Sequence, residues 1–192
     1  EPDIGGKVKK IMFEKDFVRH KLTGDYVTDN IEAEGSMLFD YNNQCWSEKL
    51  CGILEIDTSL LPKTVNPSDI VGTVTKEAAL DTGLFEGTSV LCGTTDTVME
   101  VFASGAVSKG QMTVKLATAG RICVVTDRAY PDKNLINYSH VFDGLWYPGT
   151  ATKSCAASYR WYRDTFGETY SELDEGAKTI KPGAEGLIFS PY

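Results

Sequence analysis

The segment TSVLCGTTDTVMEVFASG, residues 88–105, most restricts what this chain can fold into. Its first six residues form an apolar, β-type run. After two threonines, a helical pattern begins at Asp96 and ends at Gly105. A buried strand that passes directly into a helix is the building unit of α/β proteins, which place functional groups at that junction. The sequence therefore predicts an α/β or α+β layered architecture, with a candidate site at Asp96.

Other segments repeat this mixture of helical and β-type patterns. We expect a polar connection around Thr28 and Asp29, and a hairpin in which the turn ATAG joins residues 112–116 to residues 122–125. The apolar stripe of the last helix predicts that it packs against a core. Helices are expected over residues 8–22 (closed by Gly24), 46–54, 76–83 and 152–166 (stripe Cys155, Tyr159, Tyr162 and Phe166), and short strands over 36–40, 70–74 and within 140–147.

Charge and cysteine content narrow the class of protein. The 192 residues carry 27 acidic and 19 basic side chains, for a net charge of -8, and the basic ones are scattered. This argues against nucleic acid or an anionic membrane as a partner. No apolar run approaches the roughly 18 residues that span a bilayer, and the opening EPDIGGKVKK lacks the apolar stretch of a secretory signal. Five cysteines without a CxxC pair favour a reduced, cytoplasmic protein, and only two histidines argue against structural zinc.

Asp96 is the first candidate for chemistry. A carboxylate at the mouth of a cleft can take a proton from a bound hydroxyl group, which is general base catalysis. A helix N-cap at Asp96 or Thr95 explains the same residues equally well.

The second candidate is LATAG, residues 116–120. Small residues between two strands let backbone N–H groups and the Thr118 hydroxyl approach a phosphate closely. An ordinary hairpin turn also accounts for this segment. Neither GxxxxGK[ST] nor GxGxxG occurs in the chain, so no P-loop or dinucleotide fingerprint is present.

Read in order, several segments of the chain resemble the FGGY carbohydrate kinases, and in particular the xylulose kinases. The resemblance covers nearly the whole chain and depends on the order of its segments more than on any one of them. The segments are FEKDFVRHKLTGDYVTD, LFD and then CWSEKL, TSLLP, IVGTVTKEAALDTGLFEGTSVLCGTTD, LATAG, HVFDGLW, SCAASYRW and GLIFSPY.

The resemblance implies a ribonuclease-H-like fold of the actin, Hsp70 and sugar kinase superfamily. Residues 1–107 would end the sugar-binding domain, and residues 108–192 would begin the ATP-binding domain. The implied reaction is transfer of a phosphoryl group from ATP to a sugar or polyol hydroxyl, with D-xylulose converted to D-xylulose 5-phosphate. Mg²⁺ would be bound mostly by water and nucleotide rather than by protein ligands. A homodimer is left open.

The resemblance also implies roles for individual residues. Asp96 matches the family's general base and contacts the sugar, and Thr97 lies where many xylulose kinases have a sugar-contacting asparagine. Thr118, Ala119 and Gly120 match a loop that contacts the β- and γ-phosphates of ATP.

Three departures from the family pattern accompany these roles. Thr97 replaces the asparagine, which puts the identity of the sugar in doubt. Ala117 and Ala119 replace a glycine and a serine in the phosphate loop. The chain begins after the first phosphate loop and ends before later motifs, so we expect an internal fragment without turnover of its own. The alternatives are a kinase for ribulose, glycerol, gluconate or a signalling polyol, and a non-catalytic sugar or nucleotide sensor.

Overall fold

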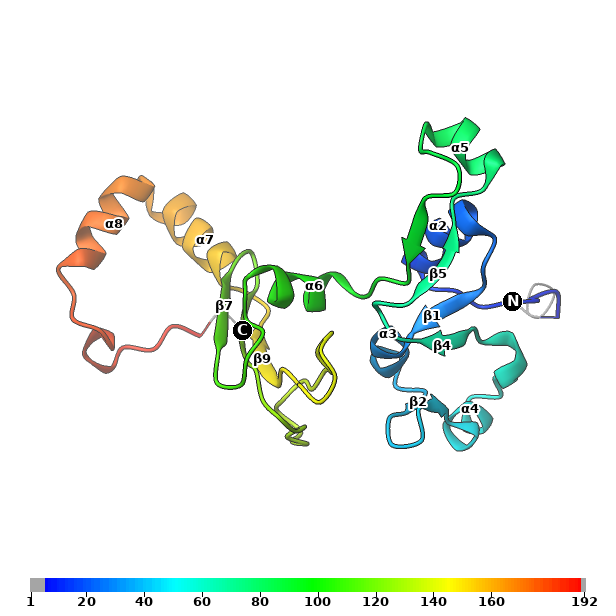
Figure 1. Ribbon diagram of the computed structural model, residues 1–192. Coiled ribbons are helices and arrows are strands. Elements are labelled where there is room, and N and C mark those ends of the chain that lie inside the picture. Colours follow the sequence, from blue (N-terminus) through cyan, green and yellow to red (C-terminus); the bar gives the residue numbers. More distant parts are fainter. Residues whose placement is uncertain (1–5, 191–192) are drawn as a thin grey trace.

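The computed structural model describes residues 6–190, so the last two residues of the GLIFSPY segment lie outside the described residues. Figure 1 shows two groups of elements side by side, joined by the segment that leads into α6. The first group comprises α2 (Glu14–Thr23), β1 (Val27–Asp29), α3 (Asn30–Gly35), β2 (Phe39–Asp40), β3 (Cys45–Trp46), α4 (Glu48–Ile53), β4 (Lys63–Val65), β5 (Ile70–Thr73), α5 (Lys76–Thr82) and β6 (Ser89–Leu91). The second comprises α6 (Asp96–Ala103), β7 (Met112–Leu116), β8 (Gly120–Val124), β9 (Gly149–Thr152), α7 (Ala156–Phe166) and α8 (Tyr170–Lys178). Two short 3₁₀ helices, Thr58–Leu60 and Ala184–Gly186, complete the assignment.

The strands of the first group form three two-stranded pairs. β1 pairs with β4 in parallel, whereas β2 with β3 and β5 with β6 are antiparallel. In the second group, β7, β8 and β9 form an antiparallel three-stranded sheet. The predicted hairpin is confirmed, because Leu116 lies opposite Gly120 and Val114 opposite Ile122.

The four helices that were expected before and after α6 are present in shortened form, as α2, α4, α5 and α7. α2 begins at Glu14 rather than at residue 8, and it ends as predicted, with Gly24 in the left-handed region at φ 79°. α6 begins at Asp96, and Gly105 after it also has positive φ, at 81°. Helix ends were predictable because glycine adopts this conformation without steric strain.

Three expectations about strands and connections were wrong. Residues 27–35 are not only a polar connection, because they contain β1 and α3. No strand lies within 140–147, where Trp146 makes only isolated bridges to Thr126 and Ser139. β6 is not a buried strand: Leu91 is 56% exposed and only the following Cys92 is buried, since within the described residues β6 pairs with β5 alone.

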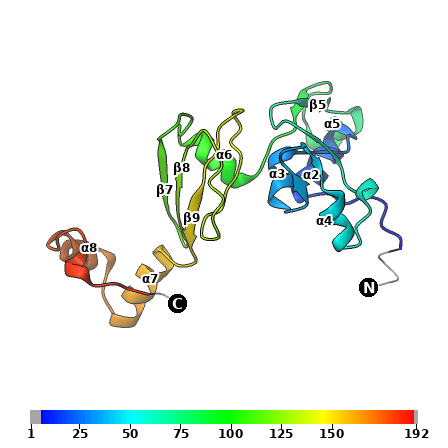
Figure 2. The ribbon, with the colours of Figure 1, turned by 90° about the horizontal axis from the view of Figure 1, so that it is seen from below.

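The apolar stripe of α7 does not face a core within the described residues. No residue of α7 is buried, and Phe166 is 59% exposed. Tyr162 and Phe166 contact each other along the helix, with ring centroids 4.5 Å apart. In both views α7 and α8 extend away from the sheet (Figures 1 and 2).

The main apolar core brings together α6 and the three-stranded sheet. Figure 2 shows the ribbon of α6 beside this sheet from below. α6 contributes Val98 and Val101, three residues apart on one face, and β8 contributes Cys123. Ile31 of α3 joins the same cluster, so the first group also contributes to this core. This packing fixes the position of α6 and of its first residue, Asp96.

Candidate active site at the start of α6

Asp96 is the first residue of α6, and its side chain is exposed. Its Oδ1 accepts hydrogen bonds from the backbone N–H and the hydroxyl of Thr97, at 2.6 and 3.2 Å. Its Oδ2 makes no hydrogen bond within the described residues. The helix N-cap is Thr95, whose hydroxyl accepts from the N–H of Val98 at 3.3 Å. Because Thr95 supplies the cap, the Asp96 carboxylate is left available to a ligand.

The segment before Asp96 is anchored to the first group of elements. The backbone N–H groups of Cys92 and Gly93 donate to the carbonyls of Asp69 and Pro67, at 2.9 and 3.0 Å. Gly93 has φ 73°, a left-handed conformation that strains other residues, although a Cβ there would meet nothing within 4 Å. The chain therefore turns sharply at this glycine, between β6 and α6.

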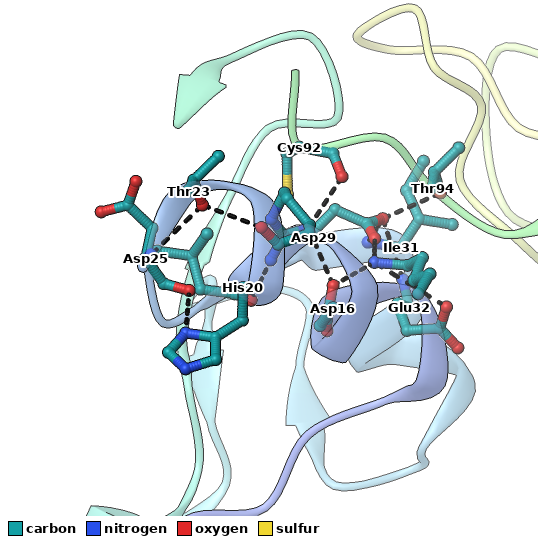
Figure 3. Close-up of polar contacts among 12 residues, drawn as sticks. Asp16, His20, Thr23, Asp25, Asp29, Ile31, Glu32, Cys92 and Thr94 are labelled. Carbon is teal, nitrogen blue, oxygen red and sulfur yellow. Dashed lines mark hydrogen bonds and ion pairs between the residues drawn. The ribbon is translucent and has the colours of Figure 1, made fainter. Parts of the chain in front are cut away.

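Asp29 provides a second anchor for this segment. Thr94 donates its hydroxyl to Asp29 Oδ1 at 2.8 Å, and Figure 3 shows this contact. The same oxygen accepts from the N–H groups of Ile31 and Glu32, at 3.1 and 3.0 Å, and so caps α3. One carboxylate thus ties the start of α3 to the residues that lead into α6.

Buried charges of α2 surround this anchor. Lys15 Nζ lies 2.8 Å from Asp29 Oδ2 and 2.7 Å from Asp16 Oδ1. Arg19 pairs with Asp16 at 2.9 Å, and it donates to the carbonyl of Cys92 at 2.8 Å. Burial on its own lowers the pKa of Lys15, but the carboxylates of Asp29 and Asp16 outweigh it and raise that pKa above its ordinary value of 10.5. Lys15 is half-buried, and Glu32 at 4.0 Å adds a third carboxylate beside it. The buried charges of Asp16, Arg19 and Asp29 are thus all paired.

The turn of the β7–β8 hairpin has the free groups that a phosphate site needs. Thr118 and Ala119 are exposed, and neither their N–H groups nor the Thr118 hydroxyl bonds to any described residue. The turn's carbonyls are satisfied by the start of α7: Cys155 N–H donates to Thr118 at 2.8 Å, and Ala156 N–H to Ala117 at 2.8 Å. The turn is therefore fixed through its acceptors while its donors stay available.

Gly120, the last residue proposed for this loop, is buried and serves packing. A Cβ at this position would lie 2.9 Å from Thr152 Cγ2 and 3.1 Å from Cys155 Cβ. The glycine lets β8 approach β9 and the residue before α7 closely. This contact sets the position of the turn, and it is compatible with a backbone contact to a phosphate.

Two hollows border this hairpin, and the first of them lies between the hairpin and α6. The first, about 320 Å³, is lined by Thr97 and Glu100 of α6 and by Lys115 and Arg121 of the hairpin, among others. The second, about 300 Å³, includes Arg121 again, together with Gly120 and residues of β9. Asp96 is not among the lining residues of either. The side chains of Val114, Ile122 and Thr150 alternate with those of Lys115 and Arg121, so the second hollow lies mainly on the sheet face opposite to α6.

Sequence reasoning missed two parts of this site. We expected only a polar connection at Asp29, although an aspartate immediately before a helix is a recognisable N-cap. Arg121 was not singled out; the available signal was a lone basic residue inside an apolar strand, immediately after the turn. Their partners, or lack of them, depend on residues distant in sequence.

In the part of the chain that the structure describes, three or more His, Cys, Asp or Glu side chains do not gather as a metal site requires. Likewise, none of the described helices combines the length and apolar character needed to cross a membrane.

Comparison with known proteins identifies the family. The N-terminal domain of the FGGY family of carbohydrate kinases matches residues 1–103, which is more than half of the chain. The xylulose kinase of Lactococcus lactis subsp. lactis (strain IL1403) is 30% identical over 195 residues, covering 100% of this chain and 39% of that protein. The gluconokinase of Bacillus subtilis (strain 168) is 27% identical over 203 residues, covering 99% of this chain and 40% of that protein.

A solved structure agrees with these relatives. The xylulose kinase from Rhodospirillum rubrum superimposes with a TM-score of 0.92 at 27% identity, over 100% of this chain and 40% of that one. The expected sugar kinase fold of the actin and Hsp70 superfamily is confirmed. The chain spans about two fifths of the length of these relatives. With the family match over residues 1–103 and this likeness across its whole length, the chain belongs to the FGGY family of carbohydrate kinases.

Proposed function

We propose that the protein transfers a phosphoryl group from ATP to a hydroxyl of a sugar or polyol, and that Asp96 is its general base. The observation that carries this proposal is an exposed carboxylate at the start of α6, with one oxygen uncommitted among the described residues, in a chain of the FGGY family. Asp96 Oδ2 accepts the proton as the substrate oxygen attacks the phosphorus. Thr97 contacts the acceptor and, through its N–H and hydroxyl, orients the Asp96 carboxylate.

The turn at Thr118 and Ala119 fits the phosphates of a nucleotide. Its two N–H groups and one hydroxyl are unbonded donors within the described residues, and small side chains leave room for a phosphate beside them. Gly120 keeps the turn close to α7, so these donors are fixed before the ligand binds. Bound ATP would supply the phosphoryl group, and Mg²⁺ bound with it would offset the charge that develops during transfer.

The remaining parts of the proposal concern organisation. We assign residues 1–107 to a sugar-binding domain and residues 108–192 to an ATP-binding domain, with closure of the two excluding water from the reaction. A cytoplasmic location follows from the need for ATP and agrees with cysteines that are all free thiols in the described chain. A homodimer is compatible with this arrangement.

For the acceptor we propose D-xylulose, as suggested by the similarity to xylulose kinases in both sequence and structure. D-gluconate is the second candidate, because gluconokinases show nearly the same identity to this chain. The other family acceptors, ribulose, glycerol and signalling polyols, complete the set to test.

ADP release by the full-length protein tests this proposal. D-xylulose, D-ribulose, glycerol and D-gluconate are compared at equal concentration against a reaction without acceptor. We expect the highest kcat/KM with D-xylulose. A higher value with D-gluconate would replace the acceptor but keep the kinase. ADP release that no acceptor raises above the background would contradict the kinase itself.

A further inference from the structure

Arg121 is a half-buried cation with two buried nitrogens that have no partner in the described residues. It lies on β8, immediately after the last residue of the phosphate turn. Its Nε and Nη2 are buried and make no hydrogen bond, and no described carboxylate pairs with it. Burying charged donors without acceptors is costly, so native proteins rarely keep them unless a ligand supplies the acceptor.

Aromatic rings fix the guanidinium in place. Its Cζ lies 5.4 Å from the ring centroid of Tyr138 and 5.9 Å from that of Tyr147. The two rings stack on each other at 5.6 Å with an interplanar angle of 13°. The Tyr147 hydroxyl is also buried without a partner among the described residues. The rings hold the cation by cation–π contact but satisfy none of its N–H groups.

The carboxylates around this cation are already engaged. Glu100 lines the same hollow, but both of its oxygens accept from Lys115 Nζ at 2.7 Å. Glu34, whose charge acts on Tyr147, accepts from the Ser139 hydroxyl at 2.9 Å. Neither acid forms an ion pair with Arg121 among the described residues.

The position of Arg121 places this charge where the reaction needs an anion. Side chains two apart on a strand share a face, and Arg121 and Cys123 both line the hollow beside α6. Thr97, next to the proposed base, lines it from the other side. Arg121 also borders the second hollow with Gly120. Arg121 therefore shares the hollow beside α6 with Thr97 and directly follows the last residue of the turn.

We infer that Arg121 binds an anionic oxygen group of a ligand in this hollow, either a carboxylate of the acceptor or the phosphoryl group being transferred. This inference rests on the proposed function for its place in the reaction, but anion binding can be measured without turnover. Both groups present paired oxygens that match the planar guanidinium, and such charge-assisted pairs are geometrically selective. A carboxylate would make the acceptor a sugar acid, and a phosphoryl group would leave a neutral sugar in place.

Calorimetric titration of the full-length protein tests this inference, with D-gluconate, inorganic phosphate and D-xylulose as probes. In R121M, which keeps the stem but loses the charge, we expect binding of gluconate or of phosphate to weaken about ten-fold or more. D-xylulose binding should stay within about two-fold. Loss for gluconate alone identifies the acceptor carboxylate; loss for phosphate alone identifies the phosphoryl group.

R128M is the matched control, because Arg128 also lies over a tyrosine, Tyr130 at 4.9 Å, but is exposed. It should bind all three probes like the wild type. R121K replaces R121M as the test if R121M does not fold. Lysine keeps the positive charge but lacks the paired N–H donors of the planar guanidinium, so anion binding should again weaken by about ten-fold.

Anion binding that is equal in the wild type and the Arg121 variants, or absent from the wild type, would overturn the inference. R121M could lose the anion binding while the wild type turns over none of the acceptors. That result would contradict the proposed function and leave the inference about Arg121 standing.

Discussion

At the residue scale, the carboxylate of Asp29 makes four contacts, with the N–H groups of Ile31 and Glu32, the Thr94 hydroxyl and Lys15 Nζ. All of these contacts converge on a fully buried side chain. Together with the backbone hydrogen bonds of Cys92 and Gly93, this carboxylate fixes the residues that lead into Asp96. Its removal would leave the Lys15 ammonium without its main counterion and α3 without its cap.

We predict that Asp29→Ala lowers the free energy of unfolding by about 3 kcal/mol, because one partner of a buried ion pair and a helix cap are lost together. Asp29→Asn is the matched variant, since its amide oxygen can still cap α3 but carries no charge. It should cost less than the alanine. Urea denaturation followed by circular dichroism measures both. A change below about 1 kcal/mol in Asp29→Ala would contradict the anchoring role.

At the element scale, α6 depends on its apolar face. Val98 is fully buried in the core, whereas the next residue, Met99, is 41% exposed. We predict that Val98→Ala costs about 2 kcal/mol, since it removes buried methyl groups and leaves a cavity. Met99→Ala should cost less than about 1 kcal/mol. Urea denaturation midpoints of the two variants and the wild type, compared at equal m-value, measure these losses. Equal losses would mean that α6 is not seated on the sheet by this face.

Local signals explain which elements the sequence could predict. Gly24 and Gly105 mark helix ends by their own conformational freedom, and the ATAG turn marks its hairpin, so these needed no distant partner. β1 is three residues long and is stabilised by pairing with β4, distant in sequence, so no periodicity could reveal it. The α7 stripe predicted a core that the described residues do not supply.

The candidate site likewise has one part that the sequence could predict and another that it could not. Asp96 and the turn were predictable because a strand–helix junction and a small-residue turn are local patterns, and the resemblance to FGGY kinases gave them roles. The free donors at Thr118 and Ala119, and the unpaired state of Arg121, are properties of the folded arrangement. A local sequence pattern does not predict whether a donor group has a hydrogen-bond partner in the folded chain.

At the scale of the whole molecule, Glu34 joins the two groups of elements. It lies on α3 and accepts from the hydroxyl and N–H of Ser139, at 2.9 and 3.3 Å. Burial raises the pKa of Glu34 above its ordinary value of 4.5, more than these hydrogen bonds lower it. The folded state therefore binds this proton more tightly than the unfolded state does.

The sign of the pH dependence follows from this raised pKa. The contribution of Glu34 to stability is full below pH 4.5 and is lost as pH rises through the folded-state pKa. We predict that Glu34→Gln removes this loss. The free energy of unfolding of the variant should therefore increase relative to that of the wild type as pH rises above 4.5. Unfolding free energies measured from pH 4 upward check this. Parallel curves for the two proteins would contradict the burial of this carboxyl between the groups.

The central claim is that Asp96 accepts the proton of the substrate hydroxyl. Steady-state kinetics of Asp96→Asn in the full-length protein, with the acceptor that gives the highest kcat/KM, test it most directly. Asp81→Asn, an exposed carboxylate on α5 that lines neither hollow, is the matched control. We predict a fall in kcat of ~10²-fold or more for Asp96→Asn, with acceptor binding retained and the control near wild type. A kcat within about two-fold of wild type in Asp96→Asn would contradict the account.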